Sequence, residues 1–116
     1  MHWRQFLFLF AGRISRHQYW GFVAVITPAS LIAAIVDSEN GYEFLGGPVA
    51  ACVILLLLWP SLAVQAKRWH DRDMSAWWIL IHVIPLVGPI AALIVNGFLR
   101  GTDGKNKYGP DPLEQP

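Results

Sequence analysis

The sequence predicts an all-α membrane protein with an N-terminal interfacial helix, two transmembrane helices and a third hydrophobic segment broken by proline and glycine. Three runs contain no Asp, Glu, Lys or Arg: residues 19–36, 46–66 and 76–99. At about 1.5 Å per helical residue, each run can cross a hydrocarbon layer roughly 30 Å thick. All nine Lys and Arg lie in three clusters outside these runs.

A chain of 116 residues that is 54% hydrophobic cannot bury three such runs in one soluble core. We therefore expect a single membrane domain over residues 1–112, in which residues 100–116 form a polar, turn-rich tail. Before the first run, Met1–Ala11 places Trp3, Phe6 and Phe10 on one helical face. This segment either lies at the membrane surface or packs as a helix on the rest of the protein.

The start of the first span has a clear local signal. Ser15 followed by Gln18 matches a helix capping box, so the helix is expected to begin near Arg16. Tyr19 and Trp20 then mark the membrane interface, where aromatic residues are enriched.

The second span follows an acidic loop, residues 37–47, that contains no cation. Pro48 suits the first turn of its helix. If this helix continues beyond the apolar run, Lys67 and Asp71 are spaced to pair one turn apart.

The third run begins after Ser75, a candidate helix cap, with Trp77 and Trp78 as an interfacial belt. Pro85 and Gly88 break it near its middle. Two shapes remain open, a kinked span and a re-entrant hairpin of two half-length helices.

The cations predict the orientation. The first two cationic clusters flank the first two spans on one side, so the positive-inside rule places the N-terminus and the 67–75 loop in the cytoplasm. A third full span would put Arg100, Lys105 and Lys107 outside, whereas a hairpin would return them to the cytoplasm. The hairpin is the slightly favoured shape.

Four motifs carry a resemblance to a known family. They are Gly12-Arg13-x-Ser15-Arg16-x-x-Tyr19-Trp20, Arg68-Trp69-His70-Asp71-x-x-x-Ser75-Ala76-Trp77-Trp78, Pro85-x-x-Gly88, and Gly101-x-x-Gly104-x-Asn106-x-Tyr108-Gly109-Pro110-Asp111-Pro112. In this order they resemble the small bacterial inner-membrane proteins of the YhaH/YhaI type, the domain of unknown function 805 family. Small departures are Trp69, where a small residue or leucine is usual, and Ala76, where glycine is frequent. The resemblance implies a plasma-membrane protein and supplies no activity.

The favoured function is binding or scaffolding at the cytoplasmic leaflet. The candidate ligands of an anionic lipid headgroup are Arg13, Arg16, Lys67, Arg68 and Arg72. Cations beside a span attract anionic lipid by about 1 kcal/mol each. If the four motifs form one site, Arg13, Arg68, His70, Asp71 and Asn106 should be neighbours. We expect lipid, a second copy or a membrane protein as partner, and no nucleic acid.

Two other classes of function stay open. His70, Asp71 and Asp73 could serve an enzyme or a metal site, although no second histidine or partnered nucleophile supports this. We therefore expect no catalysis, metal or cofactor. A small oligomeric transport or channel component would use His82 and Asn96 beside the broken segment.

Overall fold

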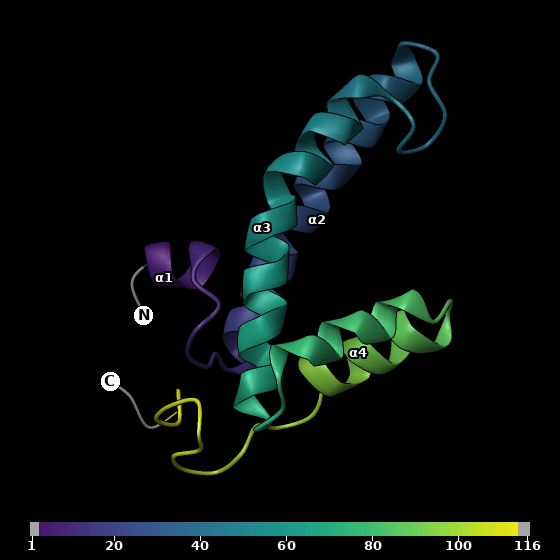
Figure 1. The fold of residues 1–116 in the computed structure, drawn as a ribbon. Helices are drawn as coiled ribbons and strands as arrows, with labels where there is room; N and C mark the ends of the chain where they lie inside the picture. The colour runs from purple at the N-terminus through teal and green to yellow at the C-terminus, as the bar shows by residue number, and fades with distance from the viewer. Residues whose placement is uncertain (1–2, 114–116) are drawn as a thin grey trace.

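The computed structural model describes residues 3–113, and Met1, His2 and the last three residues lie outside it. All the elements of regular secondary structure in this range are helices, joined by loops, in agreement with the predicted fold class (Figure 1). In chain order the elements are α1 (Trp3–Phe8), α2 (Arg16–Glu39), α3 (Pro48–Asp71), the 3₁₀ helix η1 (Ala76–Val83) and α4 (Val87–Gly97).

Helices α2 and α3 form the long arm of the molecule and are both long and apolar enough to cross a membrane. Only 17% and 28% of their most apolar windows are buried, so neither helix is enclosed as in a soluble core. The start of α2 is as predicted, with Ser15 and Gln18 forming the complete capping box. Pro48 occupies the first turn of α3.

The loop between the two long helices contains a contact that the sequence analysis missed. Asp37, at the end of α2, is only 1% exposed and accepts hydrogen bonds from the backbone N–H groups of Val49 and Ala50, at 3.1 and 2.8 Å. A carboxylate at a helix N-terminus satisfies free donors and interacts favourably with the helix dipole. A Cβ on Gly47 would lie 2.2 Å from the Asp37 carboxyl carbon, so this approach requires glycine.

The third hydrophobic run folds back on itself as a hairpin of η1 and α4. A Cβ on Gly88 would lie 1.8 Å from the carbonyl oxygen of Ile81, so glycine allows the two arms to touch. Leu86 makes the turn with a φ of 64°. In Figure 1 the hairpin projects sideways from the α2–α3 pair near one end instead of running along it. Of the two predicted shapes, the structure therefore has the hairpin.

Helix α1 packs on α3, as one of the two predicted alternatives requires. The ammonium group of Lys67 contacts the carbonyl oxygens of Gln5 and Phe6 at the end of α1. The predicted pairing of Lys67 with Asp71 is therefore wrong. The lysine side chain points toward α1, where its ammonium group donates hydrogen bonds to carbonyl oxygens that have no partner within the helix. The Trp59 indole N–H also donates to Phe8 O at 2.8 Å.

The small apolar core lies at the same end of the long arm. Ile14 and Val64 are fully buried beside Phe22, which is 9% exposed. Partly buried side chains of α1 and α2 pack against this core: Phe6, Leu7, Tyr19 and Ile26. The core thus fixes the N-terminal segment and the two long helices relative to one another, next to the polar residues described below.

Candidate functional site

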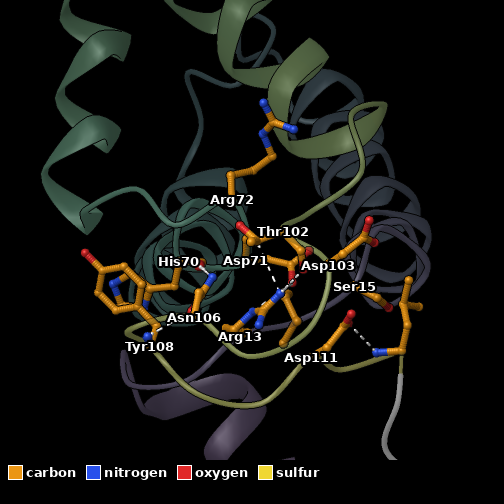
Figure 2. A network of polar contacts seen from close by, with 12 residues as sticks. Arg13, Ser15, His70, Asp71, Arg72, Thr102, Asp103, Asn106, Tyr108 and Asp111 are labelled. Carbon is orange, nitrogen blue, oxygen red and sulfur yellow. Dashed lines mark hydrogen bonds and ion pairs between the residues drawn. The ribbon is translucent and has the colours of Figure 1, made fainter.

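Arg13 lies at the centre of a buried polar cluster where three of the four sequence motifs meet (Figure 2). The remaining motif, Pro85-x-x-Gly88, lies apart from the cluster at the turn of the hairpin, so the prediction that all four motifs share one site is wrong for this motif. The guanidinium group of Arg13 donates five hydrogen bonds. Nε donates to Asp71 Oδ1 at 3.1 Å, and the two terminal nitrogens donate to Asp71 O and to three carbonyl oxygens of the tail, those of Thr102, Gly104 and Gly109. Arginine has five N–H donors, so this side chain has none left for a ligand.

Asp71 bridges two arginines. Its Oδ1 lies 3.0 Å from Arg13 Nη2 and its Oδ2 lies 2.5 Å from Arg68 Nη1, with side-chain exposures of 5% or less throughout. The backbone of Asp71 also binds the tail, because its carbonyl accepts from Thr102 N at 2.7 Å. A buried carboxylate between two cations depends on both, since losing one partner leaves an uncompensated charge.

The C-terminal end of α4 is held by side chains of α2 and α3. The last carbonyl groups of a helix have no partner within it and carry partial negative charge. Here four consecutive carbonyls each accept a hydrogen bond: Asn96 O from Arg68 Nε at 2.6 Å, Gly97 O from Trp20 Nε1 at 2.7 Å, Phe98 O from Arg16 Nη1 at 2.8 Å and Leu99 O from Arg68 Nη2 at 3.0 Å. The hairpin is therefore fixed to the end of the long arm through its backbone.

His70 connects the N-terminal motif to the tail. Its Nδ1 lies 3.0 Å from the carbonyl oxygen of Gly12, an acceptor, so Nδ1 carries the proton. The ring stacks on Tyr108 with centroids 4.0 Å apart and planes 6° apart. The Asn106 side-chain amide donates to His70 O at 2.9 Å, and the backbones of Asn106 and Gly109 exchange two hydrogen bonds of 3.1 Å (Figure 2).

The structure thus brings together Arg13, Arg68, His70, Asp71 and Asn106, the five residues predicted to be neighbours. Asp71 pairs with both arginines, whereas Asp73 is exposed and forms no ion pair within residues 3–113. Other motif residues shape the hairpin or border the cluster: Ser75, whose hydroxyl accepts from Trp77 N; Trp78, which stacks on Trp69; Pro85 and Gly88 at the turn; and Pro110, which precedes Asp111.

Asp111 holds the tail in its turn. Its carboxylate accepts from Leu113 N at 2.9 Å and Gly104 N at 3.0 Å. The Leu113 hydrogen bond is the main reason that the pKa of Asp111 lies below its ordinary value of 3.8, with the Gly104 bond and the charges of Arg13 and Arg100 acting in the same direction against burial.

Because the pKa of Asp111 is lower when folded, its contribution to stability is complete above the ordinary carboxyl pKa of about 4 and is lost as the pH falls through the folded pKa. We expect Asp111→Asn to lower the unfolding temperature at pH 7, and the difference from wild type to shrink in acid. Unfolding of detergent-solubilised protein across this range measures it. Asp103→Asn is the control, since Asp103 is 81% exposed in its ion pair. A difference that does not vary with pH would contradict the prediction.

A pocket of about 400 Å³ opens beside the buried cluster. Its lining comes from four parts of the chain and includes cations and aromatic residues: Ser15, Arg16, His17, Trp20, Asp71, Gly97, Phe98, Arg100, Gly101 and Leu113. We call it the α2–α4 pocket. Arg16 and Arg100 are exposed, whereas Asp71 is buried and already paired with two arginines. Trp20 and Phe98, with ring centroids 5.6 Å apart, form its apolar side.

The five residues predicted to bind a headgroup differ in how exposed they are and in which groups they already contact. Arg13, Lys67 and Arg68 are at most 4% exposed and donate to carbonyl oxygens inside the protein. Arg16 is exposed at the pocket, and Arg72 is half-buried and donates to Arg100 O at 2.6 Å. Arg100 was missed as a ligand because cations after an apolar run, here Arg100, Lys105 and Lys107, normally indicate only topology. Its proximity to Arg16 depends on the hairpin.

The two residues considered for a transport component, His82 and Asn96, lie at opposite ends of the hairpin. His82 lies near the turn of the hairpin and contacts Ile79 O in its own helix, whereas Asn96 is buried at the foot, with its Oδ1 unpaired. Within residues 3–113, no three His, Cys, Asp or Glu side chains gather as metal ligands.

Comparison with known proteins identifies the family. The family described as "Protein of unknown function (DUF805)" matches residues 7–110. The chain belongs to this family. It is 37% identical over 109 residues to the inner membrane protein YhaH of Escherichia coli K12, covering 92% of this chain and 89% of that protein. It is 34% identical over 104 residues to the inner membrane protein YhaI of the same strain, covering 89% and 85%.

A third relative, the uncharacterized protein YiiR of Escherichia coli K12, is 30% identical over 132 residues, with 93% of this chain and 88% of that protein covered. No solved structure matches the chain. With its two apolar helices, this DUF805 chain is an integral protein of the bacterial inner membrane.

Proposed function

We propose that this DUF805 protein binds the phosphate group of anionic lipid headgroups in the α2–α4 pocket, at the cytoplasmic face of the inner membrane. The observation that carries the proposal is the pocket itself. Arg16 and Arg100 flank it, and the N-terminal turn of α2 lies at its edge. Guanidinium groups and a helix N-terminus both favour phosphate.

The depth of the pocket supports a lipid ligand. Trp20 lies at the start of the apolar run 19–36, and its indole binds the end of α4, so the pocket is level with the membrane interface. Its apolar side, Trp20 and Phe98, suits the first carbons of an acyl chain, and its cations suit the headgroup. Arg13, Lys67 and Arg68 are buried and hold the fold. Arg16 also donates to Phe98 O, and Arg100 pairs with the exposed Asp103, but both guanidinium groups are exposed to a ligand in the pocket.

In this proposal α2 and α3 cross the membrane, so the protein is multi-pass with the N-terminus and the 67–75 loop in the cytoplasm. The distribution of charge supports this orientation, because the 37–47 loop at the far end has Asp37, Glu39 and Glu43 and no cation. Hydrogen bonds from Arg13 to the tail carbonyls keep the tail at the cationic end. With the hairpin, Arg100, Lys105 and Lys107 stay on the cytoplasmic side. A third full span would instead have placed these cations outside, against the positive-inside rule.

Lipid retention tests the proposal. Wild type and the double variant Arg16→Gln/Arg100→Gln are purified, placed in nanodiscs of phosphatidylglycerol or phosphatidylcholine, and compared by thermal unfolding and by mass spectrometry of retained lipid. At about 1 kcal/mol per cation, each substitution should weaken anionic-lipid binding about fivefold. Adding inorganic phosphate to the phosphatidylcholine sample distinguishes free phosphate from a headgroup as the ligand.

Lys105→Gln is the matched control, because Lys105 is an exposed tail cation outside the pocket lining. It should retain phosphatidylglycerol as wild type does. Equal retention by wild type and the double variant would refute the pocket as the binding site. If the double variant unfolds early in phosphatidylcholine as well, the single variant Arg100→Gln decides, since Arg16 also binds Phe98 O.

A further inference from the structure

The surface of the η1–α4 hairpin is apolar and unpartnered. Residues 76–99 contain no charge. Its outward side chains are widely exposed: Trp77 at 78%, Leu80 at 58%, Val83 at 76%, Leu86 at 77%, Val87 at 64% and Ile90 at 57%. A helix lying on a membrane surface normally keeps a polar, Lys- or Arg-rich face toward water. This hairpin has no such face and therefore needs an apolar environment around it.

The hairpin is too short to cross a bilayer. With rises of about 1.5 Å per α-helical residue and 2.0 Å per 3₁₀ residue, each arm is about 16 Å long, roughly half of a 30 Å hydrocarbon layer. Both feet are fixed at the same end of the long arm. Thr102 N donates to Asp71 O at 2.7 Å, and Arg72 Nη1 donates to Arg100 O at 2.6 Å.

The feet of the hairpin carry cations while its arms and turn do not. Arg72 and Arg100 mark the two feet, and Trp20 binds the end of α4 at the level where the first span begins. This places the feet among the headgroups of an anionic leaflet and the arms among its acyl chains. The hairpin also projects sideways from the long arm, so its arms stay near that level (Figure 1).

We propose that the η1–α4 hairpin is embedded among the acyl chains of the cytoplasmic leaflet alone, which makes the protein a wedge. The cytoplasmic leaflet accommodates α1, both long helices and the hairpin, whereas the other leaflet accommodates only α2 and α3. A molecule that is wider in one leaflet favours membrane that is convex on that side. The chain therefore prefers strongly curved bilayers with its cationic end on the convex face. This inference rests on the proposed topology but not on lipid binding in the α2–α4 pocket.

Site-specific labelling of the full chain tests the location of the hairpin. In a Cys52→Ser background, Val83→Cys places a probe on an exposed position near the turn, and Lys105→Cys places one in the tail. We expect an impermeant maleimide to label Lys105→Cys only in opened cells and to miss Val83→Cys on both sides. A bimane at residue 83 should be quenched by lipids brominated on the acyl chain.

Three results would overturn this location. Labelling of Val83→Cys from the side opposite the tail would mean that the segment crosses the membrane. Labelling from the side of the tail would place the hairpin in water. Efficient cross-linking between two Val83→Cys chains would show that a second copy of the protein, and not lipid, contacts the apolar surface of the hairpin.

Sorting between vesicles tests the wedge. Protein reconstituted into a mixture of small sonicated and large extruded vesicles should be enriched in the small ones, in the orientation that leaves the tail outside. Val87→Lys should lose this enrichment, because it places a charge on an exposed part of the hairpin. Lys105→Gln, a change of charge at an exposed tail position outside both the hairpin and the pocket lining, should keep it. Equal partition of wild type would overturn the wedge, whatever the outcome of the lipid-retention assay.

Discussion

Asp71→Asn should be among the most destabilising single substitutions in this protein. The change keeps the shape of the side chain but removes the one carboxylate that pairs with both Arg13 and Arg68, at 3.0 and 2.5 Å. Two buried guanidinium groups then lack a counter-charge, and breaking a buried pair in this way typically costs about 3–5 kcal/mol. Titration with sodium dodecyl sulfate, followed by circular dichroism, measures the loss in free energy of unfolding.

Asp73→Asn is the matched control for this prediction. It makes the same chemical change two residues away, at an exposed position with a φ of 59° that asparagine tolerates. It should leave the unfolding transition close to that of wild type. A second readout is tryptic cleavage at Lys105 and Lys107, which should accelerate in Asp71→Asn because the tail is released. Equal stability and equal cleavage in both variants would show that the buried ion pairs do not hold the fold.

Gly88→Ala should open the hairpin. The added Cβ would lie 1.8 Å from Ile81 O and 2.7 Å from Ile81 C, and both are backbone atoms that cannot rotate away. Forcing an extra methyl group into such a contact costs about 1–3 kcal/mol, so α4 must move away from η1. Hydrogen–deuterium exchange followed by mass spectrometry should show faster exchange in both arms, with a lower unfolding temperature.

Gly21→Ala provides the comparison for Gly88→Ala. Gly21 lies in α2, and a Cβ there meets nothing within 4 Å, so alanine should be neutral or raise stability by up to about 1 kcal/mol through its better helix propensity. Normal exchange in the hairpin of Gly88→Ala would mean that the arms are not in contact in the membrane.

Much of the fold follows from local signals in the sequence. The capping box at Ser15 and Gln18 sets where α2 begins, and Pro48 sets where α3 begins, because both act through the first turn of their own helix. The cationic clusters correctly identified the end of the molecule where the polar motifs meet. The proline and glycine break left two shapes open, since the sequence pattern does not determine whether the arms touch.

The partners of the cations were beyond sequence reasoning. Arg68 binds the carbonyls of Ile14, Asn96 and Leu99, and a carbonyl is common to every residue, so no side-chain pattern indicates such an acceptor. The spacing of Lys67 and Asp71 predicted a pair on one helix, but the two side chains bind different neighbours. Asp37 was interpreted as part of an acidic loop. Its role is to accept a hydrogen bond from the first turn of α3, and this contact forms only when α3 folds back beside α2.

The pairing of Arg13 with the tail also affects how synthesis of the chain ends. Its carbonyl acceptors at Thr102, Gly104 and Gly109 lie 89, 91 and 96 residues further along the chain. Chains are made from the N-terminus, so this arginine is among the first residues to leave the ribosome and its acceptors are among the last. A chain that stops before Gly109 would therefore keep the Arg13 cation, beside the start of α2 and the end of α3, without all of its acceptors.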